Sequence, residues 1–456
     1  MASGLSGVGS FSEDRKEDFQ SISLDYNEQE FSANYSSAYI QKVYPLVQPN
    51  LNQECSVHTF EIGSEHDTNF IDLQNIYANV KFIVTQADDT AVDDSDNTIS
   101  IINNIDHSLF ASTDVFINGT LISDHGKHSS LRNYITNLLS TSEQTKRTSL
   151  SVNHWLDDDS NADRTVSKDS FDSTKPVYQK ALMERGKFIK SGEVQAYFQP
   201  QFDLMTCPRL LPPGNILKLN FEVAESNFLL IVPPVTDPAG RKYKLRITSF
   251  NLEVQRCVPN QIALRHVEQA KKTLMHFPIT RTQIRNVQVL TGQHEVIIPR
   301  LVDSSQMPYQ LLMVPVQNYQ FKYLQKNPYV WKSCDIKKAN LLLNGASIPR
   351  EPFDISKISR NRVYKLIMKA LGHTELTGSS SGLSPERWWK SKFFLAWDLT
   401  GCWCAGAHNH RPTGGDLQLQ ISFSTAPATP INLYIIACYE NSISILDKIV
   451  SLDYTV

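Results

Sequence analysis

Asp114 to Ser123, which reads DVFINGTLIS, is the stretch that decides the fold. Two apolar half-strands flank Asn118-Gly119, and such a pair is the strongest short hairpin signal, because a type I′ turn needs two residues that tolerate positive φ. The same arrangement recurs at Asn340 to Pro349, which reads NLLLNGASIP around Asn344-Gly345. The two pairs lie about half of the 456 residues apart, which predicts two copies of one β-domain in tandem.

On both sides of these hairpins, short apolar runs rich in β-branched and aromatic residues alternate with polar turn clusters. Tyr243 to Val254 (YKLRITSFNLEV) alternates as a half-buried strand does. Further strands are predicted at residues 76–85, 193–198, 216–223, 228–232, 283–290, 309–316, 339–343, 393–399, 417–423 and 431–439. This pattern predicts an all-β fold with a few short helices, built as two tandem eight-stranded jelly-roll β-sandwiches.

Helical periodicity is limited to four segments, which lie between strands rather than alternating with them and so argue against a parallel βαβ sheet. These segments are residues 131–139, 177–188, 262–275 and 363–371. Prolines and glycine at positions 233–240 break the chain, so we place the first jelly roll at residues 39–235 and the second at 240–456. Residues 1–38 are polar and poor in apolar side chains, which predicts a flexible N-terminal arm.

The formal net charge of −3 argues against a dedicated nucleic-acid binder, which normally carries a basic face. Basic residues gather modestly at Arg256 to Lys272 and at Arg281 to Arg285. We interpret them as a solvated face, with contact to packaged DNA or to an adjacent subunit as the alternative.

Seven irregularly spaced cysteines and the lack of an apolar leader in residues 1–14 predict free thiols in a reducing, intracellular compartment. No apolar run approaches the roughly 18 residues that a membrane helix needs.

One loop gathers four potential zinc ligands, Cys402, Cys404, His408 and His410. Structural zinc sites usually space two cysteines two to four residues apart, which lets both thiolates surround one ion without strain. The spacing here is tighter, so we interpret the segment as a loop without a metal and keep zinc binding as the alternative. The H-x-H pair is also typical of cupins, but residues 411–416 lack the Glu that a cupin needs.

Alternating polar residues resemble the start of a calcium loop at Asp157, Asp159, Asn161 and Asp163. The sixth position is Ala162 rather than Gly and the twelfth is Lys168 rather than Glu, so the sharp turn and the bidentate ligand are missing. The chain also lacks phosphate-loop, dinucleotide-binding, zinc-protease and hydrolase motifs. We therefore expect no catalytic residue, no cofactor and no metal, and a protein that is not an enzyme.

The chain resembles the major capsid (hexon-type) proteins of Polinton/Maverick elements and adintoviruses. The similarity covers most of residues 55–450 and rests on short motifs in a shared order. These are Asn69-Phe70-Ile71-Asp72-Leu73 with Tyr77-Ala78-Asn79-Val80, His107-Ser108-Leu109-Phe110 with Asp114 to Gly119, Leu264 to Pro278, Tyr323 to Trp331, and Leu417 to Asn441. The loop at Cys402 to His410 departs from the family pattern.

The resemblance implies two jelly rolls per subunit and homotrimeric, pseudo-hexagonal capsomers. These would assemble an icosahedral shell around double-stranded DNA, with a single jelly-roll penton protein at the vertices. It implies that the chain functions in the virion capsid. Two alternatives remain: a cellular cupin-like or carbohydrate-binding jelly-roll protein, and a domesticated capsid homologue.

Overall fold

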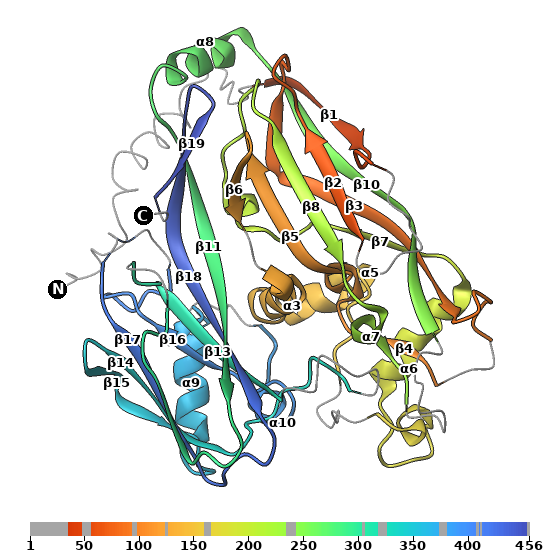
Figure 1. The fold of residues 1–456 in the computed structure, drawn as a ribbon, viewed down its shortest axis with the longest axis vertical. Coiled ribbons are helices and arrows are strands. Elements are labelled where there is room, and N and C mark those ends of the chain that lie inside the picture. The colour runs from red at the N-terminus through yellow and green to blue at the C-terminus, as the bar shows by residue number, and fades with distance from the viewer. Residues whose placement is uncertain are drawn as a thin grey trace, which may run out of the picture.

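A computed structural model describes residues 35–47, 56–93, 98–123, 126–158, 166–233, 243–302, 306–317, 326–373, 381–406, 410 and 413–453. The described chain is mainly antiparallel β-structure, arranged as two sandwiches (Figure 1). Short helices lie between strands and at the ends of the sheets. They are α2 (Ile105–Ser108), α3 (Ser129–Ser140), α4 (Glu143–Arg147), α5 (Ser149–Val152), α6 (Lys180–Phe188), α7 (Ser226–Leu229), α8 (Gln261–Ala270), α9 (Arg360–Ala370) and α10 (Pro385–Lys390).

The N-terminal sandwich consists of two four-stranded sheets. One has the order β1 (Tyr35–Val43), β10 (Tyr243–Pro259), β3 (Phe70–Gln86), β7 (Val194–Phe198). The other has the order β2 (Val57–Ile62), β8 (Leu217–Val223), β5 (Phe110–Ile117), β6 (Thr120–Ser123). Phe250 of β10 packs against Phe60 of β2 with ring centroids 4.6 Å apart, so the sheets share one core. The short strands β4 (Ser100–Ile101) and β9 (Leu230–Ile231) pair separately.

The C-terminal sandwich repeats this plan. One sheet has the order β11 (Met275–Val289), β18 (Ile431–Leu446), β13 (Gln310–Gln317), β16 (Leu395–Asp398), and β19 (Ile449–Leu452) adds to β18. The other has the order β12 (Glu295–Ile298), β17 (Leu417–Phe423), β14 (Ile336–Leu343), β15 (Ala346–Asp354). Phe353 of β15 stacks on Trp397 of β16 across the core at 5.2 Å.

The two sandwiches have the same strand order, which confirms the predicted duplication. We number the eight main strands of each sandwich in chain order, leaving out β4, β9 and β19. In both sandwiches one sheet then has the order first-eighth-third-sixth, and the other has the order second-seventh-fourth-fifth. The seventh strands, β8 (LKLNFEV) and β17 (LQLQISF), bury alternate residues in the same pattern. Helix α3 follows the fifth strand of the first sandwich, and α9 follows the fifth strand of the second.

Both predicted hairpins form, and their turns are equivalent in detail. Asn118 and Gly119 have φ of 49° and 83°, and Asn344 and Gly345 have φ of 50° and 83°. In the first turn, the Asn118 amide donates to the carbonyl of Ile216, and the Ile216 amide donates to Asn118 Oδ1, both at 2.9 Å. Asn344 makes the same pair of bonds with Asp416, also at 2.9 Å. Each Asn therefore both forms the turn and attaches it to the chain entering the seventh strand.

We expect Gly119→Ala and Gly345→Ala each to lower the free energy of unfolding by about 1–2 kcal/mol, the cost of a left-handed backbone for a residue with a Cβ. An added Cβ meets no atom within 4 Å at either site, so the penalty comes from the backbone alone. Urea denaturation followed by tryptophan fluorescence measures it. Gly401→Ala is the control, because Gly401 also has open space but no positive φ. Equal effects of all three substitutions would contradict the argument.

The structure corrects the predicted domain boundary. β10, which we assigned to the second jelly roll at 240–456, pairs along its length with β3 and β1 and is the eighth strand of the N-terminal sandwich. The sandwiches therefore divide between Pro259 and Met275, where α8 lies, and not at residues 235–240. Local turn signals mark a break in the chain, but they do not specify which sheet the next strand joins.

Other boundaries also shift. Residues 35–38 of the predicted arm belong to β1, and the rest of the arm lies outside the described residues. Helix α8 ends at Ala270, earlier than predicted, and β11 starts at Met275. Of the predicted strand 228–232, only residues 230–231 are extended, because the preceding turn is α7. Among the described helices, none is long and apolar enough to cross a membrane.

Candidate functional site

A buried group of charged and aromatic side chains, which we call the junction cluster, connects the two sandwiches. It comprises Tyr134, Trp155, Asp158, Arg185, Tyr329 and Lys392, all almost fully buried. The first four come from the long excursion between β6 and β7, and the last two come from segments flanking β14 and β16 of the C-terminal sandwich. Figure 1 shows α3, which carries Tyr134, lying between the two sets of sheets.

Asp158 is the centre of the charged part of the junction cluster. Its Oδ1 accepts from Arg185 at 2.8 Å, and its Oδ2 accepts from Lys392 Nζ at 3.1 Å. Lys392 Nζ also donates to the Tyr329 carbonyl at 2.7 Å, and Arg185 donates to the carbonyl oxygens of Ile101 and Leu156. One carboxylate therefore holds a cation from each sandwich, and most donors of both cations are satisfied.

Asp158, Arg185 and Lys392 form a charged triad, in which the ionised state of the carboxylate depends on the two cations. Burial alone raises the pKa of Asp158, but the charges and hydrogen bonds of Arg185 and Lys392 outweigh it and hold that pKa well below its usual range. Because the carboxylate stays ionised, both buried cations keep a charged partner. Removing Asp158 would leave both cations buried without a counter-charge, whereas removing one cation would leave the other paired with the carboxylate.

Aromatic rings pack beside the triad. Tyr134 stacks on Tyr329 with centroids 3.8 Å apart and an interplanar angle of 4°, and Trp155 stacks on the other side at 5.1 Å. Lys392 Nζ lies 5.0 Å from the centroid of the Tyr134 ring. The Tyr329 hydroxyl hydrogen-bonds to Ser108 Oγ at 2.6 Å. Flat rings and short polar contacts of this kind restrict the angle between the sandwiches more closely than aliphatic packing does.

Asp203 forms a second connection between the sandwiches, through a hydrogen bond. Its Oδ1 accepts from Arg132 of α3 at 2.8 Å, and its Oδ2 accepts from the backbone amide of Thr282 in β11 at 3.2 Å. Arg132 and Asp203 have side chains that are 9% and 1% exposed. The buried ion pair lies within the N-terminal half, and the bond from Thr282 links it to the C-terminal sandwich.

The metal-ligand patterns in the sequence did not indicate the junction cluster or the contacts of Asp203. Of the residues that resemble a calcium loop, Asp157 forms an ion pair with Arg387 at 2.9 Å, whereas Asp159, Asn161 and Asp163 lie outside the described residues. Asp157 is thus a structural ion-pair partner. One sequence feature could have indicated the junction cluster. Lys392 lies in the aromatic run WWKSKFFLAW, and a lysine that is buried among such residues needs a buried partner of opposite charge.

The basic segments are only partly the solvated face that we predicted. Arg256 is 2% exposed and is paired with Asp67, and Arg281 lies over the ring of Tyr439 at 4.4 Å. Arg265, Lys271 and Lys272 are exposed on and after α8. The alternation of β10 places Arg256 at an internal position, and Arg281 of β11 is partly buried, which net charge does not reveal.

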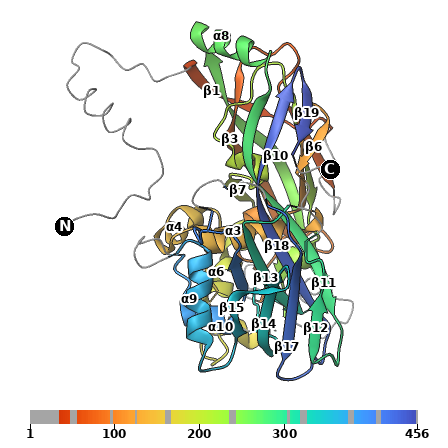
Figure 2. The ribbon, with the colours of Figure 1, turned by 90° about the vertical axis from the view of Figure 1, so that its left-hand side faces the viewer.

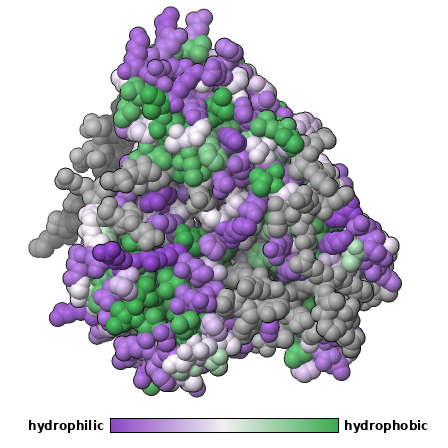
Figure 3. Space-filling model, in the orientation of Figure 1, coloured by the Kyte–Doolittle hydropathy of each residue, from purple (hydrophilic) through white to green (hydrophobic). Residues whose placement is uncertain are grey.

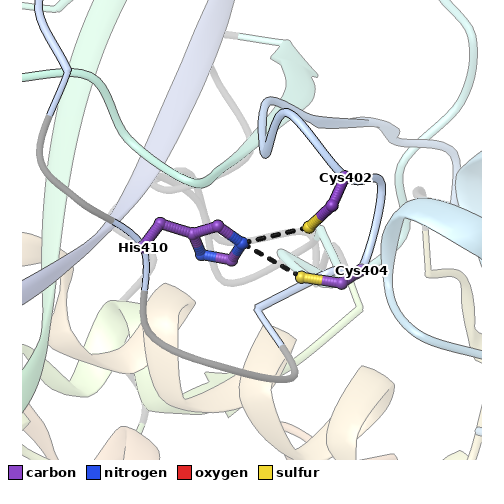
Figure 4. A group of neighbouring side chains, drawn as sticks. All are labelled: Cys402, Cys404 and His410. Atoms are coloured by element: carbon purple, nitrogen blue, oxygen red, sulfur yellow. Dashed lines mark hydrogen bonds between the residues drawn. The ribbon is translucent and has the colours of Figure 1, made fainter. Parts of the chain in front are cut away.

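The structure brings three of the four potential zinc ligands together, and His408 lies outside the described residues. His410 Nε2 lies 3.2 Å from Cys402 Sγ and 3.2 Å from Cys404 Sγ. Figure 4 shows the imidazole directed between the two sulfur atoms. The other face of His410 is held by Glu440 of β18, which accepts from the His410 amide at 2.6 Å and lies 3.2 Å from Nδ1.

The electrostatics of this loop centre on His410, which lies between two thiols and a carboxylate. The Cys402 contact raises the pKa of His410 to about 9, against a smaller opposing effect of burial and with further help from Glu440. The raised pKa means that the imidazole keeps a proton at neutral pH, so a metal ion at Nε2 would have to displace that proton.

No protein-family model matches the chain, and no curated protein matches its sequence. Solved structures do match. A chain of the Sputnik virophage structure determined by cryo-EM is 12% identical with a TM-score of 0.60, covering 95% of this chain and 92% of that one. The mavirus major capsid protein is 10% identical (TM-score 0.53, covering 100% and 96%), and the Faustovirus major capsid protein is 9% identical (TM-score 0.55, covering 93% of each). The chain therefore has the double jelly-roll fold of these viral capsid proteins.

Proposed function

We propose that the chain is the major capsid protein of a double-stranded DNA virus or virus-like element and acts structurally rather than catalytically. The observation that carries the proposal is the duplicated eight-strand topology, which extends over the whole described chain and matches capsid proteins over nearly their full length. A fold alone does not determine function. Here, however, the buried polar groups connect the two sandwiches instead of lining a reaction site.

The repeat also supports a homotrimer. Two equivalent sandwiches per chain give three chains six similar wall segments, which approximate six-fold packing. The junction cluster would keep the two sandwiches at a constant angle, as a tile requires. We propose that these trimers are the capsomers of an icosahedral shell, closed at its vertices by a single jelly-roll penton protein.

Exposed apolar side chains fit such an assembly. Ile40 on β1 is 65% exposed, and Val47 just after it is 74% exposed, although β1 is an edge strand. Leu290, directly after β11, and Ile297 in β12 are also exposed. Figure 3 shows several apolar patches among polar regions on one face, including a large one at lower left over the C-terminal sandwich. Apolar surface of this kind is typical of protein contacts.

Three finer assignments rest on sequence. The motifs near Asn69, His107 and Leu417 support membership of the Polinton/Maverick and adintovirus group. The exposed basic residues Arg265 and Lys271 support non-specific contact with packaged DNA if α8 faces the interior. The composition of residues 1–34 supports an arm that contacts neighbouring capsomers.

Size-exclusion chromatography with light scattering tests the function. We expect a trimer of three 51.6-kDa chains, and closed particles by negative-stain microscopy when a penton protein is coexpressed. Protein lacking residues 1–34 keeps all of β1 and is expected to form trimers but few shells. A monomer whose melting temperature rises with added sugar would contradict the proposal and favour a carbohydrate-binding protein. A stable trimer that never forms particles would favour a domesticated homologue.

A further inference from the structure

We propose that Cys402, Cys404 and His410 bind one Zn²⁺ ion, which closes the loop between β16 and β17 on itself beside β18. The described part of the chain contains one group of Cys, His or acidic side chains with metal-binding spacing, and it is this one, with its ligand atoms within 4.8 Å of one another. Two thiolates and an imidazole are a donor set that suits zinc.

The distances fit a tetrahedral ion. Zn–S bonds of about 2.3 Å and Zn–N bonds of about 2.0 Å place sulfur and nitrogen roughly 3.5 Å apart in a tetrahedral site. Both Sγ–Nε2 separations are 3.2 Å, so a shift of a few tenths of an ångström admits the ion. Both thiols give up their protons to solvent when the metal binds.

The backbone explains how so short a cysteine spacing can work. Trp403, between the two cysteines, has φ of 57°, and Ala405 and Gly406 continue at 54° and 77°. This left-handed turn directs both sulfur atoms to the same side, as Figure 4 shows. Lys369 of α9 lies over the Trp403 ring at 5.3 Å, which holds that side chain away from the ligands.

Asp398, at the end of β16, holds the loop in place. Its Oδ1 accepts from the Thr400 amide at 2.8 Å, and its Oδ2 accepts from the Ala405 amide at 2.8 Å. The Cys404 amide in turn donates to Thr400 Oγ1 at 3.1 Å. At Gly406, an added Cβ would lie 2.7 Å from the Tyr309 ring, so the close approach of the loop requires glycine.

Glu440 completes the arrangement as a positioning residue. It holds His410 by the backbone amide and by Nδ1, which leaves Nε2 directed at the sulfur atoms. A carboxylate on the far nitrogen of a ligand histidine is the usual outer partner in zinc sites, where it sets the tautomer and the ring orientation. Cys402 is exposed, so solvent can supply a water as the fourth ligand.

The full-length protein, purified under reducing conditions and stripped with a chelator, is titrated with Zn²⁺ against a chromophoric competitor. We expect one ion per chain, and X-ray absorption should show two sulfur ligands per zinc. Cys402→Ser, Cys404→Ser and His410→Gln should each weaken binding about 100-fold or more, because losing only an outer partner costs about 10–100-fold. Glu440→Gln should fall in that smaller range and keep two sulfur ligands.

Cys334→Ser is the matched control, because Cys334 is a half-buried thiol outside the cluster and its loss should not change zinc affinity. Cobalt absorption of the unsubstituted protein decides the question even if a variant fails to fold, since thiolate-to-metal charge transfer requires bound cysteine. Binding of less than half an ion per chain would overturn the proposal. Unchanged affinity in the ligand variants, or a Cys402–Cys404 disulfide in the freshly purified protein, would also overturn it.

Discussion

Replacing Asp158 by alanine is expected to lower the free energy of unfolding by about 3–5 kcal/mol, because it leaves Arg185 and Lys392 buried without a counter-charge. Arg185 and Lys392 have fully buried side chains, so neither cation is solvated from the surface in the folded protein. Because Asp158 and Lys392 belong to different sandwiches, the variant should also loosen their relative orientation. Urea denaturation followed by tryptophan fluorescence gives the energy, and near-ultraviolet circular dichroism reports the packing of Tyr134 and Trp155.

Lys390→Ala is the control for this prediction. Lys390 pairs with Glu386 at 2.6 Å, but both side chains are about half exposed or more, so the loss should stay below about 1 kcal/mol. If Asp158→Ala cost no more than Lys390→Ala, the triad would not contribute to stability. Trimer formation by Asp158→Ala is expected to weaken in parallel, since the three chains of a trimer must share one sandwich angle.

Acidification is expected to destabilise the protein well above the pH at which carboxylates titrate. Burial lowers the pKa of His58 to about 4 and that of His107 to about 3, whereas an unfolded histidine titrates near 6.5. Between pH 6.5 and 4 the unfolded chain therefore binds more protons, and stability is lost as the pH falls. From pH 7 to pH 5 this amounts to about 2 kcal/mol for each histidine.

The double variant His58→Phe/His107→Phe isolates this effect. Both histidines already pack edge-on against phenylalanine rings, His58 on Phe250 at 5.3 Å and His107 on Phe198 at 4.8 Å, so a ring of similar size is retained. Asp106 acts in the opposite direction, because burial raises its pKa, but it is present in both proteins. Urea midpoints at pH 7, 6 and 5 should therefore fall less steeply in the variant. Parallel pH curves would reject the assignment.

The sequence predicts the repeated architecture because its main signals are local. Alternating apolar residues in stretches such as Leu417 to Phe423 specify strands, and Asn118-Gly119 and Asn344-Gly345 specify turns through their own φ preferences. The spacing of those turns indicates two copies. No long-range information is needed for any of these steps.

Only the tertiary structure decides which strands pair and which buried charges and ligands meet, because these partners are distant in the sequence. β10 joins the N-terminal sandwich because it pairs with β3, and the hydrogen bond between Thr248 and Lys81 joins residues 167 positions apart. Lys392 pairs with Asp158, which is 234 residues away in the sequence, and His410 pairs with Glu440, which is 30 residues away. The left-handed turn at Trp403 that gathers the two sulfur atoms is also set by the surrounding fold. Residue spacing reports local conformation, whereas the pairing of buried charges and metal ligands depends on which surfaces the completed fold brings together.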